Sequence, residues 1–131
     1  MKKLLLCLII LTALSCKKKE FSPEGPTDVR IRNLSDQTFV DLIVNIKGEE
    51  ITFGDINAGS VSDYHRFKTA FPKAVISTKI NGEIFSTGPV DYTYMNYFGL
   101  MRITYEVFIE SIDNKKLKIS NVIPDSKLDL K

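Results

Sequence analysis

The sequence predicts an all-β domain: an antiparallel β-sandwich, immunoglobulin-like in the broad sense, with about seven to eight strands. From Asp28 onward, apolar and polar residues alternate with period two, and no stretch has helical periodicity. Val, Ile, Phe, Tyr and Thr dominate the alternating segments, as strands prefer. Since a sheet with one wet face must bury the other, two sheets facing each other are expected.

The first half of the domain contains four predicted strands. Val29 and Ile31 alternate with two arginines in the first strand, and the second continues the alternation. A turn at residues 57–60 separates the short third strand from the fourth. These segments are residues 29–32, 40–46, 51–53 and 61–67.

The second half contains four more. Asn81-Gly82 predicts a hairpin, because a type I′ turn needs two residues that tolerate positive φ. The seventh segment is the most one-sided, with apolar residues at every second position, and Pro124 is expected to end the eighth. These segments are residues 74–80, 84–85, 101–109 and 116–123.

The first sixteen residues predict export. Two lysines precede an apolar run over residues 4–14, which is too short to span a hydrocarbon core of about 30 Å. We therefore expect a signal peptide over residues 1–15, which is removed. A lipidated cysteine with a flexible tether (16–27), the β domain (28–124) and a short tail (125–131) follow.

Ala13-Leu14-Ser15-Cys16 resembles the lipobox of bacterial lipoproteins. The resemblance implies cleavage before Cys16, a diacylglyceryl group on its sulfur and an acyl chain on its amino group, which together anchor a protein stably. Lys17 is not the aspartate associated with inner-membrane retention, so the outer membrane is favoured. The alternative is ordinary cleavage near Ala13 or Ser15 with a free Cys16.

The balance of charge gives no reason to expect nucleic-acid binding. Of the 18 Lys and Arg residues, Lys2 and Lys3 lie in the signal, which leaves 16 against 16 Asp and Glu. With Cys7 removed and Cys16 lipidated, the mature domain has no thiol for a disulfide or a metal site. No motif calls for a cofactor.

Three stretches carry a family resemblance: residues 29–35, residues 53–64 and Pro89-Val90-Asp91-Tyr92. Together they resemble small uncharacterised lipoproteins of Bacteroidetes-type bacteria, whose expected fold is one β-sandwich behind a lipidated cysteine. The resemblance implies fold and location, and it implies no activity.

Two groups of polar residues invite a chemical interpretation. Asp63 and His65 share one face of a strand beside Ser62, but Ser62 points to the opposite face, so we expect no catalytic triad. Residues 55–57 and 113–114 carry Asp and Asn oxygens, yet neither set has enough ligands for Ca²⁺, and both are typical of turns. We therefore predict no enzyme and no metal site.

Residues 92–98 are the one unusual segment, with four aromatic residues and a methionine. In an exposed loop these rings would form a surface for a protein or glycan partner, since tyrosine combines a large area with a polar tip. Alternatively, they cover the open end of the core. The predicted contact residues are Tyr92, Tyr94, Tyr97 and Phe98.

The sequence thus predicts a lipid-anchored envelope lipoprotein that is a non-enzymatic binding or accessory module. It contacts the membrane through Cys16 and a protein or glycan through residues 92–98. The alternative is a purely structural lipoprotein within a larger assembly, with no ligand site.

Overall fold

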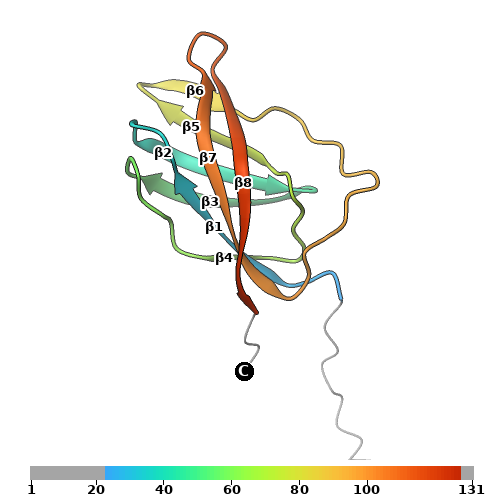
Figure 1. Ribbon diagram of the computed structural model, residues 1–131. Coiled ribbons are helices and arrows are strands. Elements are labelled where there is room, and N and C mark those ends of the chain that lie inside the picture. Colours follow the sequence, from blue (N-terminus) through green and yellow to red (C-terminus); the bar gives the residue numbers. More distant parts are fainter. Residues whose placement is uncertain (1–22, 128–131) are drawn as a thin grey trace, which may run out of the picture.

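The computed structural model describes residues 23–127, in which all regular structure is β-strand (Figure 1). This confirms the all-β class. Among these residues there is no helix long and apolar enough to cross a membrane. The strands are β1 (Thr27–Asn33), β2 (Phe39–Ile46), β3 (Glu49–Ile56), β4 (His65–Phe67), β5 (Val75–Ile80), β6 (Glu83–Ser86), β7 (Met101–Ser111) and β8 (Lys116–Lys127).

The eight strands form one mixed sheet, in the order β3-β2-β5-β6-β8-β7-β1-β4, which nearly closes into a barrel. β1 runs parallel to β7, and β6 runs parallel to β8. The prediction of a wholly antiparallel sandwich is therefore wrong in its strand directions. The chain between β1 and β7 is long enough to return to the starting end of β1, and a parallel pair requires such a crossover.

The sheet is weakly joined at two places. β6 and β8 share a single residue pair, Ser86 with Lys116. The edges of β3 and β4 meet through the rings of Phe53 and His65, whose centroids lie 4.2 Å apart. Beyond the pair at Lys116, no described strand pairs with the outer edge of β8.

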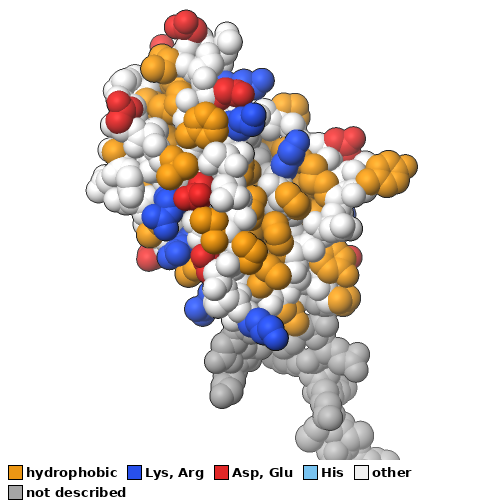
Figure 2. All heavy atoms as spheres, viewed as in Figure 1, with side chains coloured by type: hydrophobic (Ala, Val, Ile, Leu, Met, Phe, Trp, Pro, Cys, Tyr) orange, Lys and Arg blue, Asp and Glu red, His pale blue; other side chains and the backbone are white. Residues whose placement is uncertain are grey.

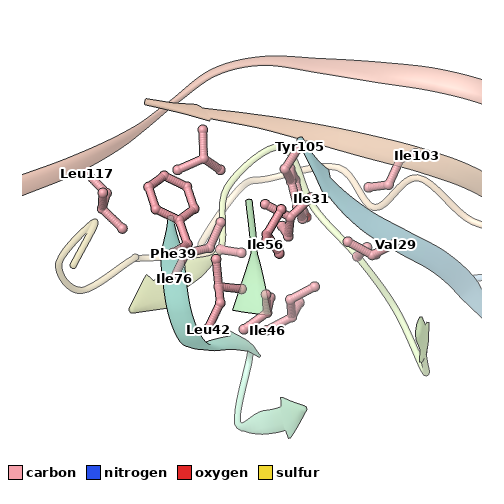
Figure 3. Packing of buried hydrophobic residues seen from close by; sticks show 14 of the residues in the cluster. Val29, Ile31, Phe39, Leu42, Ile46, Ile56, Ile76, Ile103, Tyr105 and Leu117 are labelled. Atoms are coloured by element: carbon pink, nitrogen blue, oxygen red, sulfur yellow. The ribbon is translucent and has the colours of Figure 1, made fainter. Parts of the chain in front are cut away.

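The core lies inside the curved sheet and is built from the inward-facing residues of every strand (Figure 3). Val29 and Ile31 of β1 are fully buried, as their alternation predicts. Each fully buried aliphatic side chain contributes about 1.5–3 kcal/mol relative to an exposed one. The largest fully buried side chains are Tyr105, Phe39, Phe67, Ile31, Leu42, Ile46, Ile76, Ile103 and Leu117.

Two tight hairpin turns have the same backbone geometry. Asn81 and Gly82 have φ of 51° and 80°, which confirms the predicted hairpin between β5 and β6. Lys47 and Gly48, with φ of 50° and 91°, connect β2 to β3 in the same way. Two consecutive positive φ values characterise a type I′ turn, whose twist matches that of the strands.

Two predicted strand boundaries are wrong by four residues. The fourth strand begins only at His65: the Ser62 hydroxyl accepts a hydrogen bond from the Ile31 amide (2.9 Å), so a side chain replaces a ladder partner there. β8 does not end at Pro124 but continues to Lys127. Pro124 is tolerated because it lies on the part of β8 whose outer edge pairs with no described strand, beside a register irregularity opposite Arg102 and Ile103.

Candidate functional site in the loop between β6 and β7

The segment from 87 to 100 connects β6 to β7 without regular secondary structure, and we call it the aromatic loop (Figure 1). Its fourteen residues (87–100) far exceed the about 4–6 that are usual between elements, and loops this long are usually functional or disordered. Both of its ends are fixed by hydrogen bonds. The Thr87 amide donates to Ile76 O (2.9 Å), and the Thr27 hydroxyl donates to Gly99 O (2.5 Å).

Tyr92 anchors the middle of the aromatic loop on the domain. It is half-buried, its ring centroid lies 5.1 Å from that of Phe71, and its hydroxyl donates to Asn45 O (3.4 Å). Burial raises the pKa of the Tyr92 hydroxyl above its usual value. Tyr92 therefore acts as an attachment point of the loop rather than as a free contact residue.

The support beneath Tyr92 is itself fixed by the core. The wholly buried Tyr105 of β7 donates its hydroxyl proton to Phe71 O at 2.5 Å. Because the ring is desolvated, the pKa of Tyr105 is strongly raised. On the loop side, Asp91 accepts a hydrogen bond from the Thr93 amide (2.9 Å), and the hydrogen bonds from Thr93 lower the pKa of this carboxyl group.

Tyr94 lies at the tip of the aromatic loop and is 100% exposed. It is the third residue of a turn closed by the Met95 amide, which donates to Tyr92 O (3.1 Å). Its φ is +65°, a conformation that this turn position normally gives to Gly or Asn. For a residue with a Cβ atom such a backbone is strained by about 1–3 kcal/mol.

Tyr97 and Leu100 are also exposed, at 44% and 38%, whereas Phe98 and Met95 pack against the core. The Phe98 amide donates to Ala70 O (2.9 Å), which fixes this part of the loop. The four predicted contact residues are thus divided: Tyr92 and Phe98 attach the loop, and Tyr94 and Tyr97 face the solvent. In Figure 2 apolar atoms project at the loop tip.

The structure does not bring Ser62 and His65 together. The Ser62 hydroxyl donates to Asp63 O (2.8 Å) and accepts from the Ile31 amide, so its hydrogen bonds go to the backbone. His65 packs its ring on Phe53 at the seam between β3 and β4. Both residues serve the fold in this arrangement.

The oxygens considered for calcium have structural partners as well. Asp55 lies in β3 and accepts a hydrogen bond from the Asp41 amide (2.9 Å). In the 113–114 turn, the Asn114 amide donates to Ser111 Oγ (3.1 Å). Residues 23–127 contain no group of three or more His, Cys, Asp or Glu side chains placed to hold a metal ion. Cys16 lies outside the described residues.

Sequence reasoning missed a polar network on the outer face of β1, β7 and β8. Asp125 accepts hydrogen bonds from Tyr64 (2.8 Å) and Thr104 (2.6 Å), and the Arg30 Nε donates to Thr104 Oγ1 (2.8 Å). The guanidinium groups of Arg30 and Arg102 lie 4.9 and 5.4 Å from the Tyr64 ring centroid. Burial, together with the bond to Asp125, raises the pKa of Tyr64.

This network connects the strand-poor segment before β4 to the end of β8. Arg30 pairs with Asp125 (3.8 Å), and Tyr64 and Thr104 donate to the same carboxylate, so we interpret the network as structural. The alternation of arginines with Val29 and Ile31 in β1 was the signal for a charged outer face. The partners in β8 are far away in sequence and left no signal.

Comparisons with known proteins add little. No protein-family model matches the chain, and no curated protein matches it. Among solved structures, an NMR structure of a protein from Eubacterium rectale is similar, with 15% identity and a TM-score of 0.47. The match covers 76% of this chain and 93% of the other. A likeness this low carries no argument, and the resemblance to Bacteroidetes-type lipoproteins stays a prediction.

Proposed function

We propose that this chain is a lipid-anchored lipoprotein of the bacterial envelope that holds a protein or glycan partner through the aromatic loop. The basic residues, apolar run and Cys16 of the first sixteen positions support the anchor, and Lys17 favours the outer membrane. The proposed role is binding without catalysis, because Ser62 and His65 are engaged by the fold.

One observation carries the binding proposal: Tyr94 combines a strained backbone with a wholly exposed ring. Glycine or asparagine would suit this turn position better, and an exposed ring gains nothing from burial. A strained, exposed aromatic residue on a well-anchored loop is the arrangement expected of a contact residue. Tyr97, on the same loop, enlarges the contact surface.

The chemistry of the two rings supports a protein or a carbohydrate as the partner. Tyrosine offers a flat apolar face and a hydroxyl group, and it loses little conformational entropy on binding. A peptide surface uses both features, and so does the apolar face of a sugar ring. Because Tyr92 and Phe98 fix the loop in advance, less ordering entropy is lost on binding.

The alternative is a purely structural lipoprotein that assembles through its sheet edges. β8 offers an open edge, but it carries lysines at 116, 118 and 127, a proline at 124 and irregular register. Charged residues, proline and bulges are the features with which natural proteins prevent edge-to-edge pairing. The edge therefore favours a binding module over an assembly unit.

Retention of envelope components by the tagged full chain tests the binding proposal. We expect a protein or glycan to be retained by the wild type and lost with the double variant Tyr94→Gly, Tyr97→Ser, at an unchanged melting temperature. Ile84→Ser is the matched control, because Ile84 is exposed on β6 and is not part of the aromatic loop. Equal retention by the double variant, or none by the wild type, contradicts the proposal.

The anchor has its own test. Cys16→Ala should abolish incorporation of a palmitate analogue and move the full chain from the membrane fraction to the soluble fraction. If the chain stays membrane-bound and unlabelled in both forms, ordinary cleavage or another mode of attachment replaces the proposed lipidation.

A further inference from the structure

We propose a second interaction surface, at the end of the domain opposite the start of β7, which binds a partner protein segment carrying a bulky apolar side chain flanked by Lys or Arg. We call this surface the distal mouth. It is formed by the turn between β7 and β8, the loop after β1, and the neighbouring ends of β5 and β6. Its central residues are Leu34, Asp36, Ile109, Ile112 and Asp113.

The apolar part of the distal mouth is exposed. Ile112, in the turn after β7, is 72% exposed, and Leu34, just after β1, is 46% exposed. The turn is closed by its own backbone, since the Lys115 amide donates to Ile112 O (3.2 Å). Nothing in this closure requires an apolar side chain at position 112, so its exposure suggests a contact role.

The distal mouth is hollowed on both sides of Ile112. A groove of about 820 Å³ is lined by Leu34, Phe108, Ile109 and Ile112 among others, and a smaller one of about 110 Å³ is lined by Ile80 and Phe85. Ile109 and Ile112 line both grooves. A bulky apolar side chain can therefore enter beside Ile112 and reach the end of the core.

The charge around the grooves decides the kind of partner. Asp36, Glu110 and Asp113 line the larger groove, Glu83 lines the smaller, and no Lys or Arg is among the described residues that line either one. Lys118 pairs with Glu110 (3.8 Å), and Lys115 pairs with Glu83 (3.6 Å). The electrostatic potential at the rim is therefore set by Asp36 and Asp113. Basic residues beside the apolar anchor complement such a rim.

The distal mouth lies at the end of the domain that is farthest from Pro23, where the described chain begins. In Figure 1 the chain enters near the start of β7, β8 ends there too, and the turn between β7 and β8 lies at the opposite end. Along the eleven residues of β7 this separation is about 35 Å. In Figure 2 apolar and acidic side chains adjoin one another at this end. The inference goes beyond the proposed function and does not depend on the aromatic loop.

Selection from a random peptide library displayed on phage, against the full chain in detergent, tests the inference. We expect the enriched peptides to carry a large apolar residue flanked by Lys or Arg. A synthetic copy should bind at least tenfold more weakly to Ile112→Ser and several-fold more weakly to the double variant Asp36→Asn, Asp113→Asn. Added salt should weaken its binding to the wild type more than to the double variant.

Two matched variants separate this surface from others. Ile84→Ser removes an isoleucine of similar exposure (64%, against 72% for Ile112) outside both grooves, and Tyr94→Gly alters only the aromatic loop, so both should bind the peptide like the wild type. All variants should melt like the wild type. Enrichment of neutral or acidic peptides, no enrichment, or undiminished binding to Ile112→Ser overturns the inference, as does Ile112-dependent binding to zwitterionic lipid vesicles alone.

Discussion

Tyr105 in β7 and Tyr94 in the aromatic loop place the same side chain in opposite environments. Tyr105 is wholly buried, and its hydroxyl is bonded to Phe71 O; Tyr94 is wholly exposed, on a backbone with positive φ. The strand positions its side chains by alternation, and their burial stabilises the fold. The loop positions its side chains through a few anchors, and its tip is free of any packing role. The comparison indicates that Tyr105 serves stability, whereas Tyr94 is left free for the proposed binding role.

The largest effect is expected at Tyr105. Tyr105→Ala removes a fully buried aromatic ring, and such truncations cost about 3–5 kcal/mol of unfolding free energy. Tyr105→Phe keeps the ring but leaves Phe71 O without its partner, at a cost of about 1–3 kcal/mol. Urea unfolding measures both. Losses below 1 kcal/mol for Tyr105→Ala would mean that the core does not depend on this ring.

The next largest effect is expected at Gly99, where the aromatic loop joins β7. Gly99, just before β7, has φ of +84°, and an added Cβ atom would lie 3.0 Å from Pro23 O. Gly99→Ala is therefore expected to cost about 1–3 kcal/mol of unfolding free energy. Gly88→Ala is the matched control: its φ is also +84°, but a Cβ atom would meet nothing within 4 Å, so its loss should be smaller. Equal losses would show that the contact with Pro23 is unimportant.

Alkaline pH should lower the stability of the folded state through the buried Tyr105 hydroxyl. Burial raises the pKa of Tyr105 in the folded state, so below the ordinary tyrosine pKa of about 10 both states hold the proton. Above it the unfolded state loses its proton first, and stability falls by about 1.4 kcal/mol per pH unit for this group. Unfolding measured between pH 9 and pH 11 should show a shallower decline in Tyr105→Phe. Identical slopes would contradict a buried, protonated Tyr105.

Much of the fold was predictable because strands leave a local signal. The alternation around Val29 and Ile31 correctly assigned their burial, and Asn81-Gly82 correctly assigned a type I′ turn. The strand directions were not predictable, because the parallel pairing of β1 with β7 depends on residues that are distant in sequence. The prediction that Pro124 ends the eighth strand was wrong, because the effect of a proline depends on whether its part of the strand has a partner on that edge. The pairing of the edge is known only once the sheet is known.

The candidate site was only partly predictable. The composition of residues 92–98 identified the loop, but it did not separate the anchors Tyr92 and Phe98 from the exposed Tyr94 and Tyr97. That division depends on contacts with Phe71 and Ala70, which lie on a different segment. The distal mouth left no sequence signal for the same reason, since its grooves combine side chains from three parts of the chain, 34–37, 80–85 and 108–113.

The smallest change in stability provides the most direct test, at Tyr94 itself. The unfolding free energies of Tyr94→Gly and Tyr94→Asn should equal or slightly exceed that of the wild type, because both residues relieve the positive φ and no buried surface is lost. A gain of up to about 1 kcal/mol is expected for Tyr94→Asn, because asparagine does not raise the conformational entropy of the unfolded chain as glycine does. A loss of 1 kcal/mol or more in both variants would show that the ring serves the fold, and it would contradict the assignment of Tyr94 to binding.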